Sequence, residues 1–128
     1  MKPKIVIFCG SSKFVDIMAI CAWLVERDEN KIALGLHLLP WWYSTKCSDH
    51  LAEAEGVAEK MDALHFKKIE MSDEIFVINY DDYIGDSTRR EIEHAKSLGI
   101  PRRWFTHDPV GVACQTMITA AISAVGGG

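Results

Sequence analysis

Several features that would assign this chain to a class of protein are missing from its sequence. There is no excess of basic residues, because 14 Lys and Arg stand against 18 Asp and Glu and give a formal net charge of -4. A nucleic-acid scaffold normally has a basic face, so we expect no nucleic-acid partner. Residues 109–128 carry no charge, yet their Gln, Thr, Ser and Gly residues make them too polar for a bilayer span. We therefore expect no membrane partner and a small-molecule ligand.

Metal-site and signal-peptide patterns are missing as well. The 4 cysteines contain no CxxC pair, and the 5 histidines contain no HxH or HxxxH pair. This excludes a recognisable zinc knuckle or disulfide framework, and we expect buried thiols and no metal site. Before Gly10 the only apolar run is Ile5 to Cys9, which is too short for a secretory h-region. We expect the protein to remain in the cytoplasm.

The chain does contain apolar runs that alternate with amphipathic segments. Runs at 4–9, 31–39, 74–80 and 102–105 are typical of strands buried in a parallel sheet. Helical spacing marks segments from Phe14 to about 30, from 48 to 71 with a weak point at Gly56, and from Ser87 to Leu98. This predicts one α/β domain over residues 1–108, a Rossmann-like (flavodoxin-like) three-layer sandwich with a mostly parallel sheet of four or five strands. Residues 109–128 are expected to form an apolar C-terminal helix or tail that packs on this domain or on a neighbouring subunit.

The stretch from Asn79 to Glu91 concentrates ionisable side chains between an expected strand and an expected helix. Ligands of open α/β sheets bind at the carboxyl ends of strands, so this loop is the candidate active site. Glu91 lies about one turn into the helix, where its carboxylate can face a cleft and act as a general base or as a nucleophile toward carbon. The alternative is a surface glutamate paired with a nearby Arg or Lys.

Three further groups have two interpretations each. Gly10-Ser11-Ser12-Lys13 lies at an expected helix N-terminus and can hold a phosphate or simply cap the helix. Trp41-Trp42-Tyr43 can stack on a flat base or form a hydrophobic plug or subunit contact. His65, which shares a helix face with Asp62, is either a packed residue or a catalytic one.

Three motifs together resemble the nucleoside 2-deoxyribosyltransferase superfamily, which includes small 2′-deoxynucleoside 5′-phosphate N-hydrolases. They are Cys9-Gly10-Ser11-x-Lys13, Asp73-x5-Asn79, and the segment from Tyr83 to Ala95, within a resemblance that runs from about Lys4 to Phe105. The resemblance implies a nucleoside or nucleoside 5′-monophosphate as substrate, with no metal or organic cofactor. It also implies a homodimer or larger homo-oligomer, because relatives build their sites between subunits.

The resemblance also implies roles for individual residues. Glu91 matches the nucleophile that attacks C1′ of the sugar, and Ser87 matches a loop serine near the sugar-phosphate. Gly10, Ser11 and Lys13 match the phosphate cradle, and Asp62 or His65 stands near the position of a family Asp that assists the leaving group. The remaining candidate substrate contacts are Ser12, Trp41, Trp42, Tyr43, Asn79, Tyr83, Gly85, Asp86 and Arg90.

The sequence departs from the family pattern in its first strand, where Ile7-Phe8 stands in the region that often holds a Tyr beside the nucleophile. Lys13 also replaces a bidentate Arg in the phosphate cradle. Two functions therefore remain open. One is cleavage or transfer of an N-glycosidic bond through Glu91. The other is an inactive module that binds or senses nucleotides.

Overall fold

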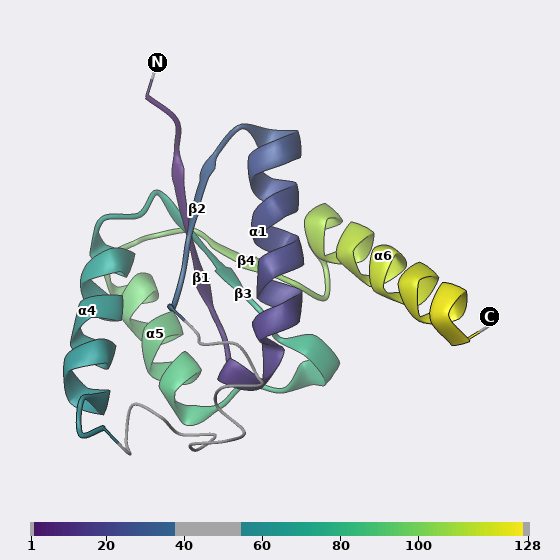
Figure 1. Cartoon of the computed structure of the whole chain (residues 1–128). Coiled ribbons are helices and arrows are strands. Elements are labelled where there is room, and N and C mark those ends of the chain that lie inside the picture. Colours follow the sequence, from purple (N-terminus) through teal and green to yellow (C-terminus); the bar gives the residue numbers. More distant parts are fainter. Residues whose placement is uncertain (1, 38–54, 127–128) are drawn as a thin grey trace.

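The computed structural model describes residues 2–37 and 55–126 (Figure 1). Its centre is a parallel sheet made of β1 (Ile5–Cys9), β2 (Ile32–Leu34), β3 (Glu74–Val77) and β4 (Arg102–Trp104), in the order β2-β1-β3-β4. Within the described residues, four helices flank the sheet: α1 (Val15–Glu29), α4 (Ala58–Glu70), α5 (Asp86–Ser97) and α6 (Pro109–Gly126). The predicted α/β class and parallel sheet, in a Rossmann-like or flavodoxin-like sandwich, are confirmed.

The two faces of the sheet are covered by different helix pairs because side chains alternate along β1 and β3. Val6 and Phe8 pack with residues of α1 and the first half of α6, whereas Ile7 and Cys9 pack with residues of α4 and α5. Both inner strands are buried on both sides, which explains their uninterrupted apolar sequences. The direction of Cys9 toward α4 and α5 follows directly from this alternation.

Helix α6 begins against the end of β4 and then projects away from the sheet (Figure 1). A Cβ at Gly111 would collide with the backbone carbonyl of Phe105, so the close approach of α6 requires glycine there. Cys114 and Val110 are buried against α1, while Ile122 and Val125 are exposed. The helix expected near the C-terminus is thus present. No helix in the described part of the chain has the length and apolar character needed to cross a membrane.

Several expected boundaries were wrong. The helix expected over 48–71 is α4, which begins only at Ala58, because Gly56 adopts a φ of +74° in a turn. The second strand ends at Leu34, and residues 35–37 do not continue it. The third strand ends at Val77, and Tyr80–Asp82 instead forms a short 3-10 helix, η2. The remainder of the segments expected at 31–39 and 48–71 lies outside the described residues.

Candidate active site

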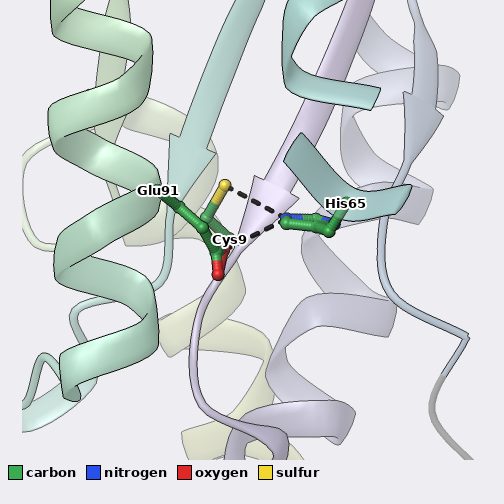
Figure 2. Close-up of side chains that lie close together, drawn as sticks. All are labelled: Cys9, His65 and Glu91. Carbon is green, nitrogen blue, oxygen red and sulfur yellow. Dashed lines mark hydrogen bonds and ion pairs between the residues drawn. The ribbon is translucent and has the colours of Figure 1, made fainter. Parts of the chain in front are cut away.

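Three ionisable side chains converge beside the carboxyl end of β1. Cys9 is the last residue of β1, His65 lies on α4, and Glu91 lies in the second turn of α5 (Figure 2). His65 and Glu91 point toward Cys9 from the two helices that cover this face of the sheet (Figure 2). Glu91 therefore faces inward, and it is not the solvated surface glutamate of the alternative interpretation.

The three groups are close together and buried. The Cys9 Sγ lies 3.5 Å from His65 Nε2, and the same nitrogen lies 3.1 Å from Glu91 Oε1. The side chains of His65 and Glu91 are only 2% and 10% exposed. The contact between His65 and Glu91 has ion-pair distance without hydrogen-bond direction, because Glu91 Oε1 has no hydrogen-bond partner among the described residues. His65 Nδ1 has none there either.

A buried carboxylate oxygen and a buried imidazole nitrogen that lack hydrogen-bond partners reduce the stability of the folded chain. Such groups are uncommon in native proteins and are concentrated where a site is prepared for a ligand or for chemistry. Burial and, after it, the negative charge of the adjacent Glu91 raise the pKa of the Cys9 thiol well above its ordinary value. Cys9 is thus a neutral thiol near neutral pH, not an activated nucleophile.

The candidate phosphate loop connects β1 to α1. Gly10 is tightly enclosed, since a Cβ there would stand 2.8 Å from Met18 Cε and 3.0 Å from Ile78 Cβ. Ser11 caps the short 3-10 helix η1 (Ser12–Phe14), and its Oγ accepts a hydrogen bond from the Lys13 N–H at 3.3 Å. Ser11 thus caps η1, whereas α1 itself begins after Phe14 without a side-chain cap. Ser12 and Lys13 are exposed.

The candidate loop before α5 contacts the loop that follows β1. Lys13 Nζ lies 3.3 Å from the centroid of the Tyr83 ring, which links the first loop to the candidate loop through a cation–π contact. Gly85, the residue before α5, lies against the same ring. Arg90 donates a hydrogen bond to Ser87 Oγ at 3.2 Å, and both residues are exposed.

Other candidate residues have no hydrogen bond or ion pair with Glu91 in the described part of the chain. The Asn79 amide donates to Thr106 Oγ1 at 3.0 Å and accepts from the Thr106 N–H at 3.2 Å, so it joins the ends of β3 and β4. Asp86 and Asp62 are exposed. Of the two proton-donor candidates, His65 contacts Glu91, whereas among the described residues no hydrogen bond or ion pair joins Asp62 to Glu91. Trp41, Trp42 and Tyr43 lie outside the described residues.

Cys9 is the site residue that the sequence analysis missed. The resemblance placed the first-strand residue beside Glu91 in the region of Ile7-Phe8. Phe8 points to the opposite face, toward α1 and α6, whereas Cys9 at the end of the strand faces α4 and α5 and contacts His65. Its position directly before the Gly10 loop was the signal that could have identified it. The donor atoms of Cys9, His65 and Glu91 all lie within 4.8 Å of one another, which makes this trio the candidate metal-ligand set within the described residues.

A groove of about 690 Å³ lies elsewhere, between η2 and α6, and is lined by residues such as Tyr80, Phe105 and Thr116. It does not include the Cys9 cluster, which faces the other helix pair. The chain matched no protein-family model, no curated protein and no solved structure in comparisons with known proteins.

Proposed function

We propose that this chain belongs to the nucleoside 2-deoxyribosyltransferase superfamily and cleaves or transfers the N-glycosidic bond of a (deoxy)nucleoside or its 5′-monophosphate. Glu91 is the proposed nucleophile at C1′. The observation that carries the proposal is the buried Glu91 carboxylate, whose Oε1 has no hydrogen-bond partner among the described residues and lies 3.1 Å from His65. A nucleophilic carboxylate needs a free oxygen and a neighbouring proton carrier, and this pair supplies both.

The proposed reaction has two displacements. Glu91 Oε1 attacks C1′ as the bond from C1′ to the base nitrogen breaks, and protonated His65 gives its Nε2 proton to the departing base. Water or a second base then attacks C1′, the Glu91 ester bond breaks with retention, and His65 recovers a proton from the attacking group. Retaining glycosidases hold nucleophile and acid about 5 Å apart, so a bound sugar must separate His65 from Glu91.

The loop after β1 is the proposed binding site of a 5′-phosphate. Ser12 and Lys13 are exposed there, and Gly10 is directly bonded to Cys9 of the cluster. A phosphate would compete with the Tyr83 ring for the Lys13 ammonium, which lies 3.3 Å from the ring centroid. We also propose a homodimer or larger assembly, which the exposed apolar residues Val112, Met117, Ile122 and Val125 of uncharged α6 support.

A second candidate function is a nucleotide-binding module without turnover. Its supporting observation is the burial of Glu91, whose side chain is only 10% exposed. In this alternative the same loop binds the nucleotide, and the carboxylate never reaches C1′.

The first experiment separates these functions. Purified protein is incubated with a panel of deoxynucleosides and their 5′-monophosphates, and free base is followed by chromatography. We expect release by the wild type and a loss of at least about 1,000-fold in Glu91→Gln, because removal of a covalent nucleophile removes the pathway. Glu93→Gln, an exposed neighbour on the same helix, is the matched control and should retain activity. Thermal stabilisation by nucleotides without any release would favour the binding module, and full activity of Glu91→Gln would refute the proposed nucleophile.

A second experiment tests the role of His65. His65→Gln should lose about 100-fold or more in kcat on nucleosides, which need leaving-group protonation. A deoxyriboside with an acidic phenol as leaving group should lose much less, because that group departs without a proton. Equal losses on both substrates would contradict proton donation by His65.

A further inference from the structure

We propose that Cys9, His65 and Glu91 together bind a divalent transition-metal ion of the Zn²⁺ class. The Cys9 Sγ, His65 Nε2 and a Glu91 carboxylate oxygen come from β1, α4 and α5 and lie within 4.8 Å of one another. Figure 2 shows the three side chains close together at the end of β1, with dashed contacts that lead to the His65 ring. The proposal departs from the sequence-based expectation of no metal site, because residues so far apart in the chain leave no spacing motif.

Two of the three distances between donor atoms match those around a tetrahedral ion, and the third, from Cys9 Sγ to the Glu91 oxygen, is within 4.8 Å. Zinc bonds of about 2.3 Å to sulfur and about 2.0 Å to nitrogen or oxygen, at tetrahedral angles, separate S from N by about 3.5 Å and N from O by about 3.3 Å. The corresponding distances here are 3.5 Å from Cys9 Sγ to His65 Nε2 and 3.1 Å from that nitrogen to Glu91 Oε1. Three protein ligands leave a fourth position for water or another small ligand.

The charges and ligand types of the cluster also favour such an ion. One imidazole nitrogen faces two neighbours, and it can share a single proton or lone pair with only one of them at a time. Glu91 Oε1 is left without a hydrogen bond among the described residues. A cation accepts electron pairs from all three groups at once and supplies positive charge to a buried carboxylate. Thiolate and imidazole ligands select Zn²⁺, Co²⁺ or Cu over the hard ions Mg²⁺ and Ca²⁺.

Binding releases one proton. The Cys9 S–H bond breaks, the sulfur keeps the electron pair and bonds to the metal, and the proton passes to solvent. The Glu91 oxygen that the ion occupies is the oxygen proposed above to attack C1′. This consequence rests on the proposed function: the metal-loaded protein is inactive as a glycosidase, and removal of the metal restores activity.

Metal titration without substrate tests the binding itself. Chelator-treated protein is titrated with Zn²⁺ by calorimetry and with Co²⁺ by absorption. We expect one Zn²⁺ per chain and, with Co²⁺, the intense visible bands of four-coordination together with a thiolate-to-cobalt charge-transfer band. Cys9→Ser should abolish the charge-transfer band, and His65→Gln and Glu91→Gln should each weaken Zn²⁺ binding by at least about tenfold.

The chain offers matched controls for each ligand type. Cys21→Ser changes a buried thiol on the opposite face of the sheet, and His94→Gln and Glu93→Gln change residues of α5 outside the cluster. These three variants should keep the affinity and the charge-transfer band. Circular dichroism shows whether each variant is folded. If Cys9→Ser does not fold, the Zn²⁺ affinities of Glu91→Gln and His65→Gln test the metal site instead. Binding unchanged in the folded ligand variants, or a Co²⁺ spectrum of the wild type without a thiolate band, would overturn the proposal.

The two proposals fail separately. Base release with no metal binding by chelator-treated protein would refute only the metal site. Metal binding by a protein that releases no base even after treatment with a chelator would leave the metal site standing and refute the glycosidase. If both hold, Zn²⁺ should inhibit base release at the concentration that half-saturates binding, and a chelator should reverse the inhibition.

Discussion

Two groups of charged side chains lie on opposite faces of the same sheet, and they are built differently. On the α1 and α6 face, Arg103 of β4 donates hydrogen bonds of 2.7 to 3.0 Å to Glu29, Glu74 and Asp108. Lys31 donates to Glu74 at 2.9 Å. On the α4 and α5 face, the Cys9 cluster has short distances but leaves His65 Nδ1 and Glu91 Oε1 without hydrogen-bond partners among the described residues.

The difference indicates what each group contributes. The Arg103 network connects the end of α1, the start of β3, β4 and the residue before α6, where Asp108 also accepts a hydrogen bond from the Val110 N–H at 2.9 Å. A network whose members are all paired serves to hold elements together. A buried cluster with unpaired members lowers stability and is retained where a ligand or a reaction uses it. The comparison therefore separates a structural charge network from the candidate active site.

Removal of the Arg103 side chain at the centre of the network should cause the largest loss of stability. Arg103→Met should lower the free energy of unfolding by about 3 kcal/mol, because three carboxylates each lose a charged partner and the Arg103 side chain is only 14% exposed. Urea unfolding followed by circular dichroism measures it. Arg102→Met is the matched control, since Arg102 donates only to the Ile100 carbonyl at 2.9 Å among the described contacts, and should cost less than about 1.5 kcal/mol. Equal losses in the two variants would contradict the assigned role.

Acid should weaken the same network. Hydrogen bonds from Arg103 lower the pKa of Glu29, and for Asp108 burial raises the pKa but hydrogen bonds from Arg103 and the Val110 N–H outweigh it and lower it. Both pKa values are lower in the folded chain than the ordinary value of about 4, so their contribution is complete above about pH 5 and is lost as the pH falls further. The stability difference between wild type and Arg103→Met should therefore shrink between pH 5 and pH 3 in urea unfolding. A constant difference over this range would show that Arg103 acts through packing alone.

The sequence predicted the sheet and the helices well, because continuous apolar runs and helical spacing report burial directly. It left open whether Glu91 faces inward or lies on the surface, and the fold decides this because Ala95, one turn later on α5, is buried against the sheet. It missed Cys9, because a strand that is apolar on both faces has no alternation to show which residue points to which helix. Neighbouring residues of a strand point to opposite faces, so Phe8 and Cys9 face different helix pairs although they are adjacent.

The charge network was hidden for a different reason. Arg102 and Arg103 are adjacent, and only the fold shows that Arg103 reaches Glu29, which is 74 positions away in the chain. Local sequence spacing identifies pairs within a helix but not contacts between distant segments. The start of α4 could not be fixed for a third reason, since the helical period of apolar residues continued across Gly56.

The smallest expected change in stability is the one that most clearly distinguishes the two groups. Glu91→Gln should leave the free energy of unfolding of chelator-treated protein unchanged or raise it by up to about 1 kcal/mol, because the amide removes a buried charge and can donate to His65 Nε2. Glu93→Gln, at an exposed position of the same helix, should change it by no more than about 0.5 kcal/mol. Both are measured by urea unfolding beside wild type. A loss above about 2 kcal/mol in Glu91→Gln would make Glu91 a structural residue like Arg103 and remove the physical basis for treating its carboxylate as a prepared nucleophile, whereas retained stability with lost base release would assign the residue to chemistry.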